Sequence, residues 1–197
     1  MNGYMGKILW VDLSKKKITE EILNEKLCKT YIGGSGLGAR ILFERMKPGV
    51  DPLGPKNILG FVTGPFTGTP ALGGARYVVV GKSPLTGTWG DANSGGNFGP
   101  YLKFSGYDAV FFTGASSKPV YLLINNGVAE IKDAAGLWGK DTYDTEDIIR
   151  NEFGKDTEVA CIGPAGEKLS LIAGVINNKG RAAARSGLGA VMGSMKL

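Results

Sequence analysis

Glycine is the residue that most constrains how this chain can fold. It occupies 32 of the 197 positions, whereas globular proteins contain about 7% glycine. The glycines follow no period and alternate with short apolar runs, so neither a collagen helix nor a flexible linker is indicated. We therefore expect a folded domain with many tight turns, in which backbone segments approach one another closely.

Between the glycines, runs of apolar and β-branched residues predict short strands. These runs lie at 7–13, 18–22, 58–63, 77–80, 109–113, 120–124, 128–131, 159–162 and 171–176. Asn126-Gly127 predicts a hairpin turn, and a second hairpin is expected at the N-terminus. Helices are expected at 24–32, 37–46, 96–105 and 145–153. No change of composition marks a linker, so we expect one α+β domain over 1–197 with mixed or antiparallel sheets.

The chain contains no histidine and two cysteines, Cys28 and Cys161. The lack of histidine excludes a Ser-His-Asp triad, imidazole acid–base catalysis and the common zinc sites. The cysteines are isolated in sequence, and we interpret each as a small buried hydrophobic residue. A metal bound by this chain alone would therefore need a carrier that supplies its own ligands.

The net charge is +5, and the one basic run, Lys15-Lys16-Lys17, is interpreted as an exposed hairpin turn. Basic and aromatic residues do not alternate along the chain, so nucleic acid is not expected as a partner. No apolar run is long enough to cross a membrane, and the N-terminus has no signal-peptide pattern. We expect a cytoplasmic protein without a membrane partner.

Arg181 and Arg185 stand among small residues in the stretch 177–193. If the backbone is helical there, residues four apart lie on one face. A guanidinium group is permanently charged, and its paired donors match carboxylate or phosphate. Gly187, Gly189 and Gly193 are expected to let backbone N–H groups approach a ligand. The stretch therefore indicates a small, flat, anionic ligand.

A second stretch is similar to the first. Arg76 follows Gly73-Gly74-Ala75 and precedes the small polar residues of 91–99, and each stretch follows a Gly-Pro turn, Gly64-Pro65 or Gly163-Pro164. This repetition suggests a degenerate internal duplication with two half-sites that face one ligand. The alternative is that both stretches are ordinary glycine-rich loops. Motifs of this kind have limited specificity, so the pattern alone does not favour one interpretation over the other.

The stretch 33–39 contains a Gly-x-Gly-x-x-Ala pattern that is also found in dinucleotide-binding loops. The residues before it are charged and predicted to be helical, whereas a dinucleotide fingerprint follows a buried strand. Val50-Asp51-Pro52 is a turn at the place where a ribose-binding acid should end a strand. We therefore interpret the stretch as the start of a helix.

Nine short motifs follow one another along the whole chain. They are Trp-Val-Asp-Leu at 10–13, Gly-Pro-Phe-Thr-Gly at 64–68, Lys-Ser-Pro-Leu-Thr-Gly at 82–87, Ala-Asn-Ser-Gly-Gly at 92–96, Phe-Ser-Gly-Tyr-Asp at 104–108, Leu-Trp-Gly-Lys at 137–140, Ile-Gly-Pro-Ala-Gly-Glu at 162–167, Arg-Ala-Ala at 181–183 and Gly-Ala-Val-Met-Gly-Ser at 189–194. In this order the motifs resemble the N-terminal domain of the aldehyde ferredoxin oxidoreductases.

The resemblance implies two sheets, related by an approximate internal duplication, that form a base under a bis-pyranopterin cofactor carrying tungsten or molybdenum. In this family dithiolene sulfurs of two pterins hold the metal, so a chain without histidine can still carry it. Backbone carbonyls that match Asn93 and Ala182 would hold the magnesium that bridges the pterin phosphates. By motif match, one pterin would be bound by Arg76, Asn93 and Gly95. The other would be bound by Arg181, Ala182, Ala184 and Arg185.

Two features depart from the family pattern. The family has Arg-Ala-Ala-Gly-Arg-Gly-Gly where this chain has Ala184 and Ser186, and neither residue adopts every glycine conformation. The family also continues through two further, largely helical domains that supply the cysteines of a [4Fe–4S] cluster and the acid–base residues of the substrate pocket. Such a cluster needs four thiolates. We therefore assign no catalytic residue to this chain and expect it to be inactive alone.

The function implied by the resemblance is oxidation of an aldehyde to a carboxylic acid, with ferredoxin as electron acceptor and a homodimer as one assembly to test. Two alternatives stay open. One is a stand-alone, non-catalytic pterin- or phosphate-binding module. The other is the same domain of a related tungsten enzyme that acts on another substrate, such as a carboxylic-acid or aromatic acyl-CoA reductase.

Overall fold

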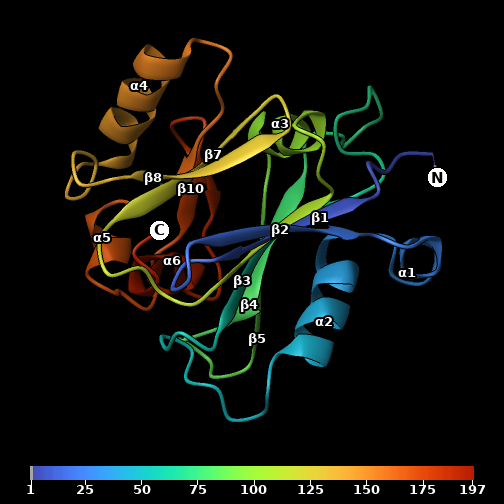
Figure 1. Cartoon of the computed structure of the whole chain (residues 1–197), viewed down its shortest axis with the longest axis horizontal. Coiled ribbons are helices and arrows are strands. Elements are labelled where there is room, and N and C mark those ends of the chain that lie inside the picture. Colours follow the sequence, from blue (N-terminus) through green and yellow to red (C-terminus); the bar gives the residue numbers. More distant parts are fainter. Residues whose placement is uncertain (1) are drawn as a thin grey trace.

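The first half of the chain forms a six-stranded sheet, and the second half forms a smaller sheet and a hairpin (Figure 1). The computed structural model describes residues 2–197. The first half contains β1 (Lys7–Asp12), β2 (Lys17–Ile22), α1 (Glu25–Tyr31), α2 (Gly34–Arg45), β3 (Ile58–Thr63), β4 (Tyr77–Lys82), β5 (Trp89–Ser94), α3 (Phe98–Phe104) and β6 (Ala109–Thr113). The second half contains β7 (Val120–Asn125), β8 (Val128–Asp133), α4 (Thr142–Phe153), β9 (Ala160–Cys161), α5 (Pro164–Glu167), β10 (Val175–Asn177), β11 (Arg181–Ala183) and α6 (Leu188–Ser194).

The large sheet has the strand order β2-β1-β6-β3-β4-β5. β1 and β6 are parallel, and the other neighbouring strands of this sheet are antiparallel. The smaller sheet has the order β11-β10-β9, and β7 pairs with β8 as a hairpin. The predicted α+β class with mixed and antiparallel sheets is confirmed.

The large sheet is buried on both faces because its strands alternate between two hydrophobic clusters. In β3, Leu59 and Phe61 belong to one cluster, whereas Ile58 and Val62 belong to the other. Helices α1 and α2 cover the second face. Their buried side chains are Cys28, Leu37, Ile41 and Leu42.

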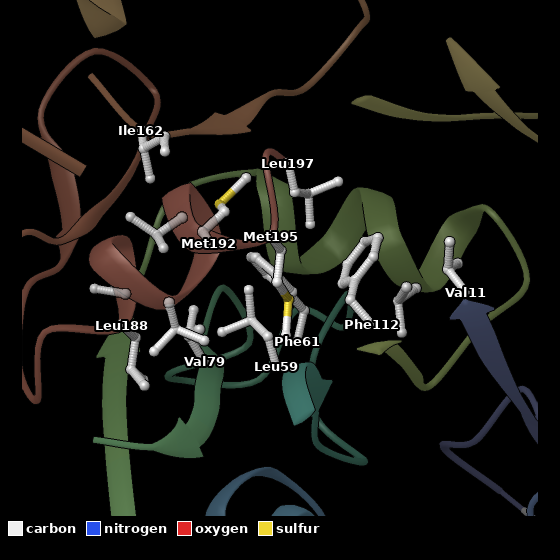
Figure 2. Close-up of a cluster of buried hydrophobic side chains, with 14 of the residues drawn as sticks. Val11, Leu59, Phe61, Val79, Phe112, Ile162, Leu188, Met192, Met195 and Leu197 are labelled. Carbon is white, nitrogen blue, oxygen red and sulfur yellow. The ribbon is translucent and has the colours of Figure 1, made fainter. Parts of the chain in front are cut away.

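The other face of the large sheet packs against the second half of the chain (Figure 2). Side chains of the sheet meet side chains that follow residue 160. The first group includes Val11, Leu59, Phe61, Val79 and Phe112, and the second includes Ile162, Leu188, Met192, Met195 and Leu197. The two halves are therefore joined by one continuous hydrophobic core.

The order of elements repeats between the halves. Each half begins with a hairpin, β1–β2 or β7–β8, continues with helix, and then forms three neighbouring strands, β3-β4-β5 or β9-β10-β11. A helix follows in both cases, α3 or α6. Gly64-Pro65 and Gly163-Pro164 each lie between the first and second of the three strands. This repeated order supports the internal duplication.

Most predicted elements are confirmed, but the second half differs in detail. The strands expected at 159–162 and 171–176 are shorter, as β9 and β10. Helix α4 begins at Thr142, before the expected residue 145, because the side chain of Asp141 accepts from the N–H of Asp144 and caps it. The strands β5 and β11 and the helices α5 and α6 were not predicted.

Gly187, Gly189 and Gly193 are buried and pack against other backbone segments. A Cβ at Gly193 would lie 2.1 Å from the carbonyl oxygen of Gly166, and one at Gly189 would lie 2.5 Å from that of Gly174. The prediction of close backbone approach is thus confirmed. The expectation that the N–H of Gly189 approaches a ligand is wrong, because this N–H donates to the carbonyl of Ala173 at 2.9 Å. For Gly187 and Gly193 it stays a prediction.

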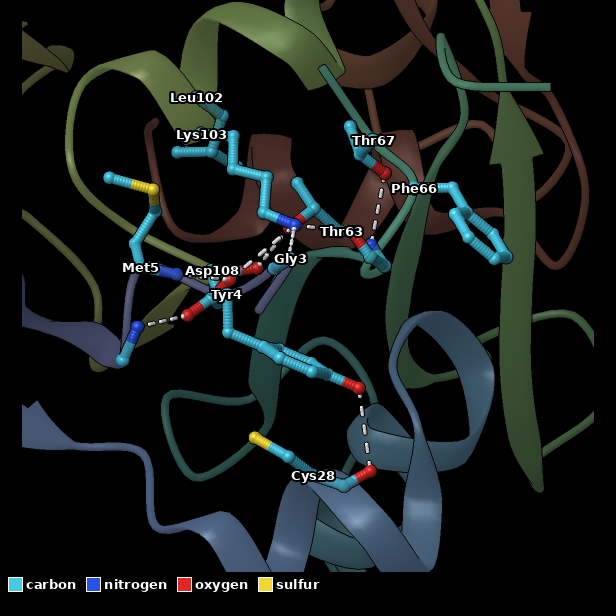
Figure 3. Close-up of polar contacts among 12 residues, drawn as sticks. Gly3, Tyr4, Met5, Cys28, Thr63, Phe66, Thr67, Leu102, Lys103 and Asp108 are labelled. Carbon is cyan, nitrogen blue, oxygen red and sulfur yellow. Dashed lines mark hydrogen bonds and ion pairs between the residues drawn. The ribbon is translucent and has the colours of Figure 1, made fainter. Parts of the chain in front are cut away.

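A buried ion pair ties the N-terminal segment to the large sheet (Figure 3). Lys103, which is 4% exposed, lies 3.7 Å from Asp108 and donates to the carbonyls of Gly3 and Gly64. The carboxylate of Asp108 accepts from the backbone N–H groups of Met5 and Gly6. Burial lowers the pKa of Lys103, and the charge of Asp108 opposes this shift.

We expect Gly193→Ala to lower the free energy of unfolding by about 1–3 kcal/mol, because the added methyl group meets backbone that cannot rotate away. Gly136→Ala is the matched control, since nothing lies within 4 Å of a Cβ at that position. Chemical denaturation of both variants measures the difference. Equal stabilities would show that the contact between α5 and α6 tolerates the methyl group.

We expect Lys103→Met to lower the free energy of unfolding by about 3–5 kcal/mol, because it leaves Asp108 buried without its cation. Lys118→Met is the control. Lys118 also pairs with a carboxylate, that of Asp133, but both side chains are about half exposed. The control should unfold almost as the unchanged protein does. A Lys103 variant as stable as the control would contradict the proposed role of the buried pair.

Candidate functional site

The junction between the two sheets brings the predicted site residues together. β5 is an edge strand of the large sheet, and β11, an edge strand of the small one, runs beside it. The hydroxyl of Ser186 donates to the carbonyl of Asp91 (3.2 Å), and its own carbonyl accepts from the hydroxyl of Ser83 (2.8 Å). The chain after β11 therefore lies along β5.

Arg76, Asn93 and Gly95 form the first cluster at this junction. Nη1 of Arg76 donates to Oδ1 of Asn93 at 2.9 Å, and the same nitrogen lies 3.8 Å from the place of a Cβ on Gly95. Thr67 fixes the backbone of Arg76, since its hydroxyl donates to the Arg76 carbonyl at 2.7 Å. Arg76 and Asn93 are exposed, so both are accessible to a ligand.

The second cluster lies on and just after β11. Arg181 pairs with Asn177 and Ala182 with Ile176 in the ladder between β11 and β10. Arg181, Ala182, Ala184 and Arg185 are all exposed. The placement of the two arginines on one helical face is wrong, because Arg181–Ala183 is a strand that pairs with β10.

The two departures from the family motif differ in their structural consequence. Ser186 has φ +64°, a left-handed conformation that glycine adopts at lower cost. Ala184 is not among the residues with positive φ, so alanine is unstrained there. Alanine at position 184 therefore replaces the family's glycine without backbone strain, whereas serine at position 186 adopts a strained left-handed conformation.

The arginines are not equivalent within the structural repeat. Arg76 directly precedes β4, the second strand of its half, whereas Arg181 begins β11, the third strand of its half. The first half therefore contributes an arginine and an asparagine from neighbouring strands, and the second half contributes one strand and its following loop. The two clusters therefore differ in construction within the structural repeat.

The junction is electrostatically suited to an anion. Among residues 2–197, no carboxylate forms an ion pair with Arg76, Arg181 or Arg185, and no hydrogen bond is made by the side chains of the latter two. Guanidinium groups keep their charge at any physiological pH. Three permanent positive charges thus remain available to a bound ligand.

Neither cysteine is available as a ligand or nucleophile. Cys28 and Cys161 are buried, and burial raises the pKa of both thiols, that of Cys161 to about 12. No group of three or more His, Cys, Asp or Glu side chains in the described part of the chain could hold a metal ion. The interpretation of the cysteines as buried hydrophobic residues is confirmed.

Two other regions of the molecule contain none of the predicted site residues. A cavity of about 530 Å³ opens between α3, β7 and the end of α4, lined by residues that include Tyr101, Phe104 and Phe153 but by none of the predicted site residues. The Gly-x-Gly-x-x-Ala stretch begins α2 and follows α1 rather than a strand, which confirms its interpretation as the start of a helix. Within residues 2–197, no helix has the length and apolar character needed to span a membrane.

Asn177 and Asn178 were not predicted as site residues. Asn177 lies opposite Arg181 in the ladder and donates from Nδ2 to the carbonyl of Gly95 at 2.9 Å. Asn178 accepts from the backbone N–H of Asn97 at 2.8 Å. The sequence signal was two consecutive asparagines that end two residues before β11. Their partners, about 80 residues away, could not be identified from it.

Comparison with known proteins places this chain in a family. The sequence profile described as "Aldehyde ferredoxin oxidoreductase, N-terminal domain" matches residues 8–197. Tungsten-containing aldehyde ferredoxin oxidoreductases from Pyrococcus horikoshii and Pyrococcus furiosus are 50% and 48% identical to the chain, over 100% of it and 33% of their own sequences. The chain thus spans about a third of the length of these relatives.

A solved structure has the same fold. It is the active-site complex BamBC of benzoyl coenzyme A reductase with 1,5-dienoyl-CoA, which superposes with a TM-score of 0.96 at 40% identity, over 100% of this chain and 30% of that one. Sequence and structure therefore agree, and the chain belongs to the aldehyde ferredoxin oxidoreductase family, whose N-terminal domain it matches over residues 8–197.

Proposed function

We propose that this chain binds the bis-pyranopterin cofactor of a tungsten-dependent aldehyde:ferredoxin oxidoreductase. The observation that supports this most strongly is a group of three exposed arginines where β5 and β11 meet, none of which forms an ion pair among residues 2–197. Relatives about 50% identical to the chain are named as tungsten-containing enzymes of this kind. A cofactor with anionic phosphates matches unpaired guanidinium groups.

Each half of the junction would hold one pterin. Arg76, with Asn93 and Gly95 beside it, would bind the first pterin. The second would be bound by Arg181, Ala182, Ala184 and Arg185. The small side chains at three of these positions leave room for a flat ring system close to the backbone. The carbonyls of Asn93 and Ala182 would hold the magnesium ion that bridges the pterin phosphates.

Residues 1–197 would bind and orient the cofactor, and they would stabilise its negative charge. When bound, the tungsten–pterin group supplies the two-electron redox chemistry that converts an aldehyde and water into a carboxylic acid. The two electrons would pass through a [4Fe–4S] cluster to ferredoxin, and the cluster's four thiolates would come from outside this chain. A cytoplasmic location and a homodimer stay predictions.

The same domain in an enzyme with another substrate is the second candidate. The benzoyl coenzyme A reductase complex has this fold at a TM-score of 0.96, so the scaffold is compatible with a different reaction. The higher identity to aldehyde ferredoxin oxidoreductases, 50% against 40%, favours the aldehyde. A downstream Cys-x-x-Cys-x-x-x-Cys run in the same reading frame would favour either enzyme over a stand-alone binding module.

In a polypeptide of full family length, we expect Arg76→Ala or Arg181→Ala to lower cofactor affinity by about tenfold to a hundredfold. Each guanidinium would make charge-assisted hydrogen bonds worth about 1.5–3 kcal/mol. Lysine at either position should restore the affinity only in part, because it lacks the planar pair of donors. Tungsten and pterin per folded protein are measured after anaerobic production with tungstate.

Arg45→Ala is the matched control for these variants. Arg45 is also an exposed arginine, but it binds both carboxylate oxygens of Glu21, away from the junction. Its replacement should leave the cofactor content unchanged, and circular dichroism reports folding in every variant. Full cofactor content in both junction variants would mean that these stretches are ordinary glycine-rich loops.

The 197-residue chain produced alone, anaerobically and with tungstate, should not oxidise aldehydes with an artificial dye as acceptor. Its two cysteines are buried, and a [4Fe–4S] cluster needs four thiolates. Dye reduction and the iron content of the purified chain are measured together. Turnover that depends on tungsten would overturn the assignment of catalysis to residues outside this chain.

A further inference from the structure

A buried asparagine connects the two half-sites of the junction. Asn177, which is 1% exposed, satisfies its whole side-chain amide within the protein. Its Oδ1 accepts from the hydroxyls of Tyr77 and Ser94, each at 2.9 Å. Its Nδ2 donates to the carbonyl of Gly95 (2.9 Å) and to Oδ1 of Asn178 (2.8 Å). Three of these four partners belong to the first half of the chain, whereas Asn177 ends β10 in the second half.

Asn178 extends the connection to the segment that precedes α3. Its Oδ1 accepts from the N–H of Asn97 at 2.8 Å, and its Nδ2 donates to the carboxylate of Glu158. Asn178 has φ +46°, a conformation that asparagine adopts more readily than most residues. A Cβ at Gly96 would lie 2.3 Å from Oδ1 of Asn178, so the two segments are interlocked.

The interlocked segments carry the two clusters of the site. Asn177 is paired with Arg181 in the β10–β11 ladder, and its side chain is bonded to the carbonyl of Gly95, two residues after Asn93. A displacement of Asn177 would therefore move Arg181 relative to Gly95. The amide group is suited to this role because it accepts and donates at once, which a carboxylate or an aliphatic side chain cannot do.

We propose that Asn177 and Asn178 are positioning residues that set the spacing between the two pterin-binding half-sites. This inference rests on the proposed function, and it assigns a role to residues that do not themselves contact the cofactor. A cofactor with two pterins joined through one metal has a fixed span. A site whose two halves are held at that span loses less free energy on binding than one whose halves must first be ordered.

A purely structural role would predict loss of stability without loss of cofactor, and the chain contains a matched control. Asn57 is 0% exposed and also makes four side-chain hydrogen bonds, to the carbonyls of Pro52 and Lys82 and from the N–H groups of Ile58 and Lys82. It binds the last residue of β4, whereas Asn177 binds Tyr77, the first residue of that strand. The two asparagines are therefore equally buried and equally bonded at opposite ends of β4.

The test uses a polypeptide of full family length, produced anaerobically with tungstate, in the variants Asn177→Ala, Asn178→Ala, Asn57→Ala and Arg76→Ala. Thermal unfolding, tungsten and pterin per folded protein, and the electron paramagnetic resonance spectrum of W(V) are measured. Asn177→Ala and Asn57→Ala should lower Tm by similar amounts. Of these two variants, only Asn177→Ala should also reduce tungsten and pterin content, by about tenfold or more, as expected when a residue that orients metal-binding groups is lost.

Asn178→Ala keeps the inference testable if Asn177→Ala does not fold, because Asn178 is only partly buried. It should reduce cofactor content less and shift or broaden the W(V) spectrum, while Asn57→Ala leaves the spectrum unchanged. One result would overturn this inference and leave the proposed function intact. In that result, the Asn177 and Asn178 variants match Asn57→Ala in cofactor content and spectrum, while Arg76→Ala loses cofactor. Full cofactor content in Arg76→Ala would overturn the proposed function and this inference with it.

Discussion

The close packing of the second half of the chain against the first is the constraint on which the rest of this structure depends. It requires backbone to lie against backbone where α6 meets α5 and the start of β10, and glycine is the residue that permits this. The shared hydrophobic core then places β11 beside β5. The predicted site residues lie on or next to these two strands, so they are brought together only when the halves are packed together.

The polar groups at this junction have two separate tasks. Asn177 and Asn178 satisfy buried donors and acceptors within the protein, which avoids the cost of unpaired polar groups. Arg76, Arg181 and Arg185 remain exposed and without ion pairs among residues 2–197. The buried amides fix the geometry, and the exposed guanidinium groups keep their charge for a ligand. Each task uses the side chain whose chemistry suits it.

Much of the fold could be predicted because its elements carry local signals. Asn126-Gly127 marked the β7–β8 hairpin, and continuous apolar runs marked β3 and β6. β5 could not be predicted in this way, because the residues that alternate inwards are the small ones, Gly90, Ala92 and Ser94. A Cβ at Gly90 would lie 2.9 Å from that of Ser186, so small size, not hydrophobicity, is what that face requires.

The site was predicted as a set of residues but not as a geometry. Motif resemblance identified Arg76 and Asn93, and the structure joins them by a hydrogen bond. The strand conformation at Arg181 depends on pairing with β10, and the role of Asn177 depends on Tyr77 and Ser94, 100 and 83 residues away. No window of local sequence contains these partners.

The parallel pairing of β1 with β6 also sets the order of events during synthesis. β1 lies about a hundred residues before β6. The N–H groups of Met5 and Gly6 are separated by a similar length of chain from the carboxylate of Asp108, to which they donate. At roughly 5–20 residues per second, a ribosome needs about 5–20 s to make that length of chain. During this time the β1–β2 hairpin can form, but Leu9 and Val11, which are fully buried in the finished fold, have no sheet to cover them. Until β6 emerges, the nascent chain therefore exposes apolar side chains of β1 that the finished fold buries completely.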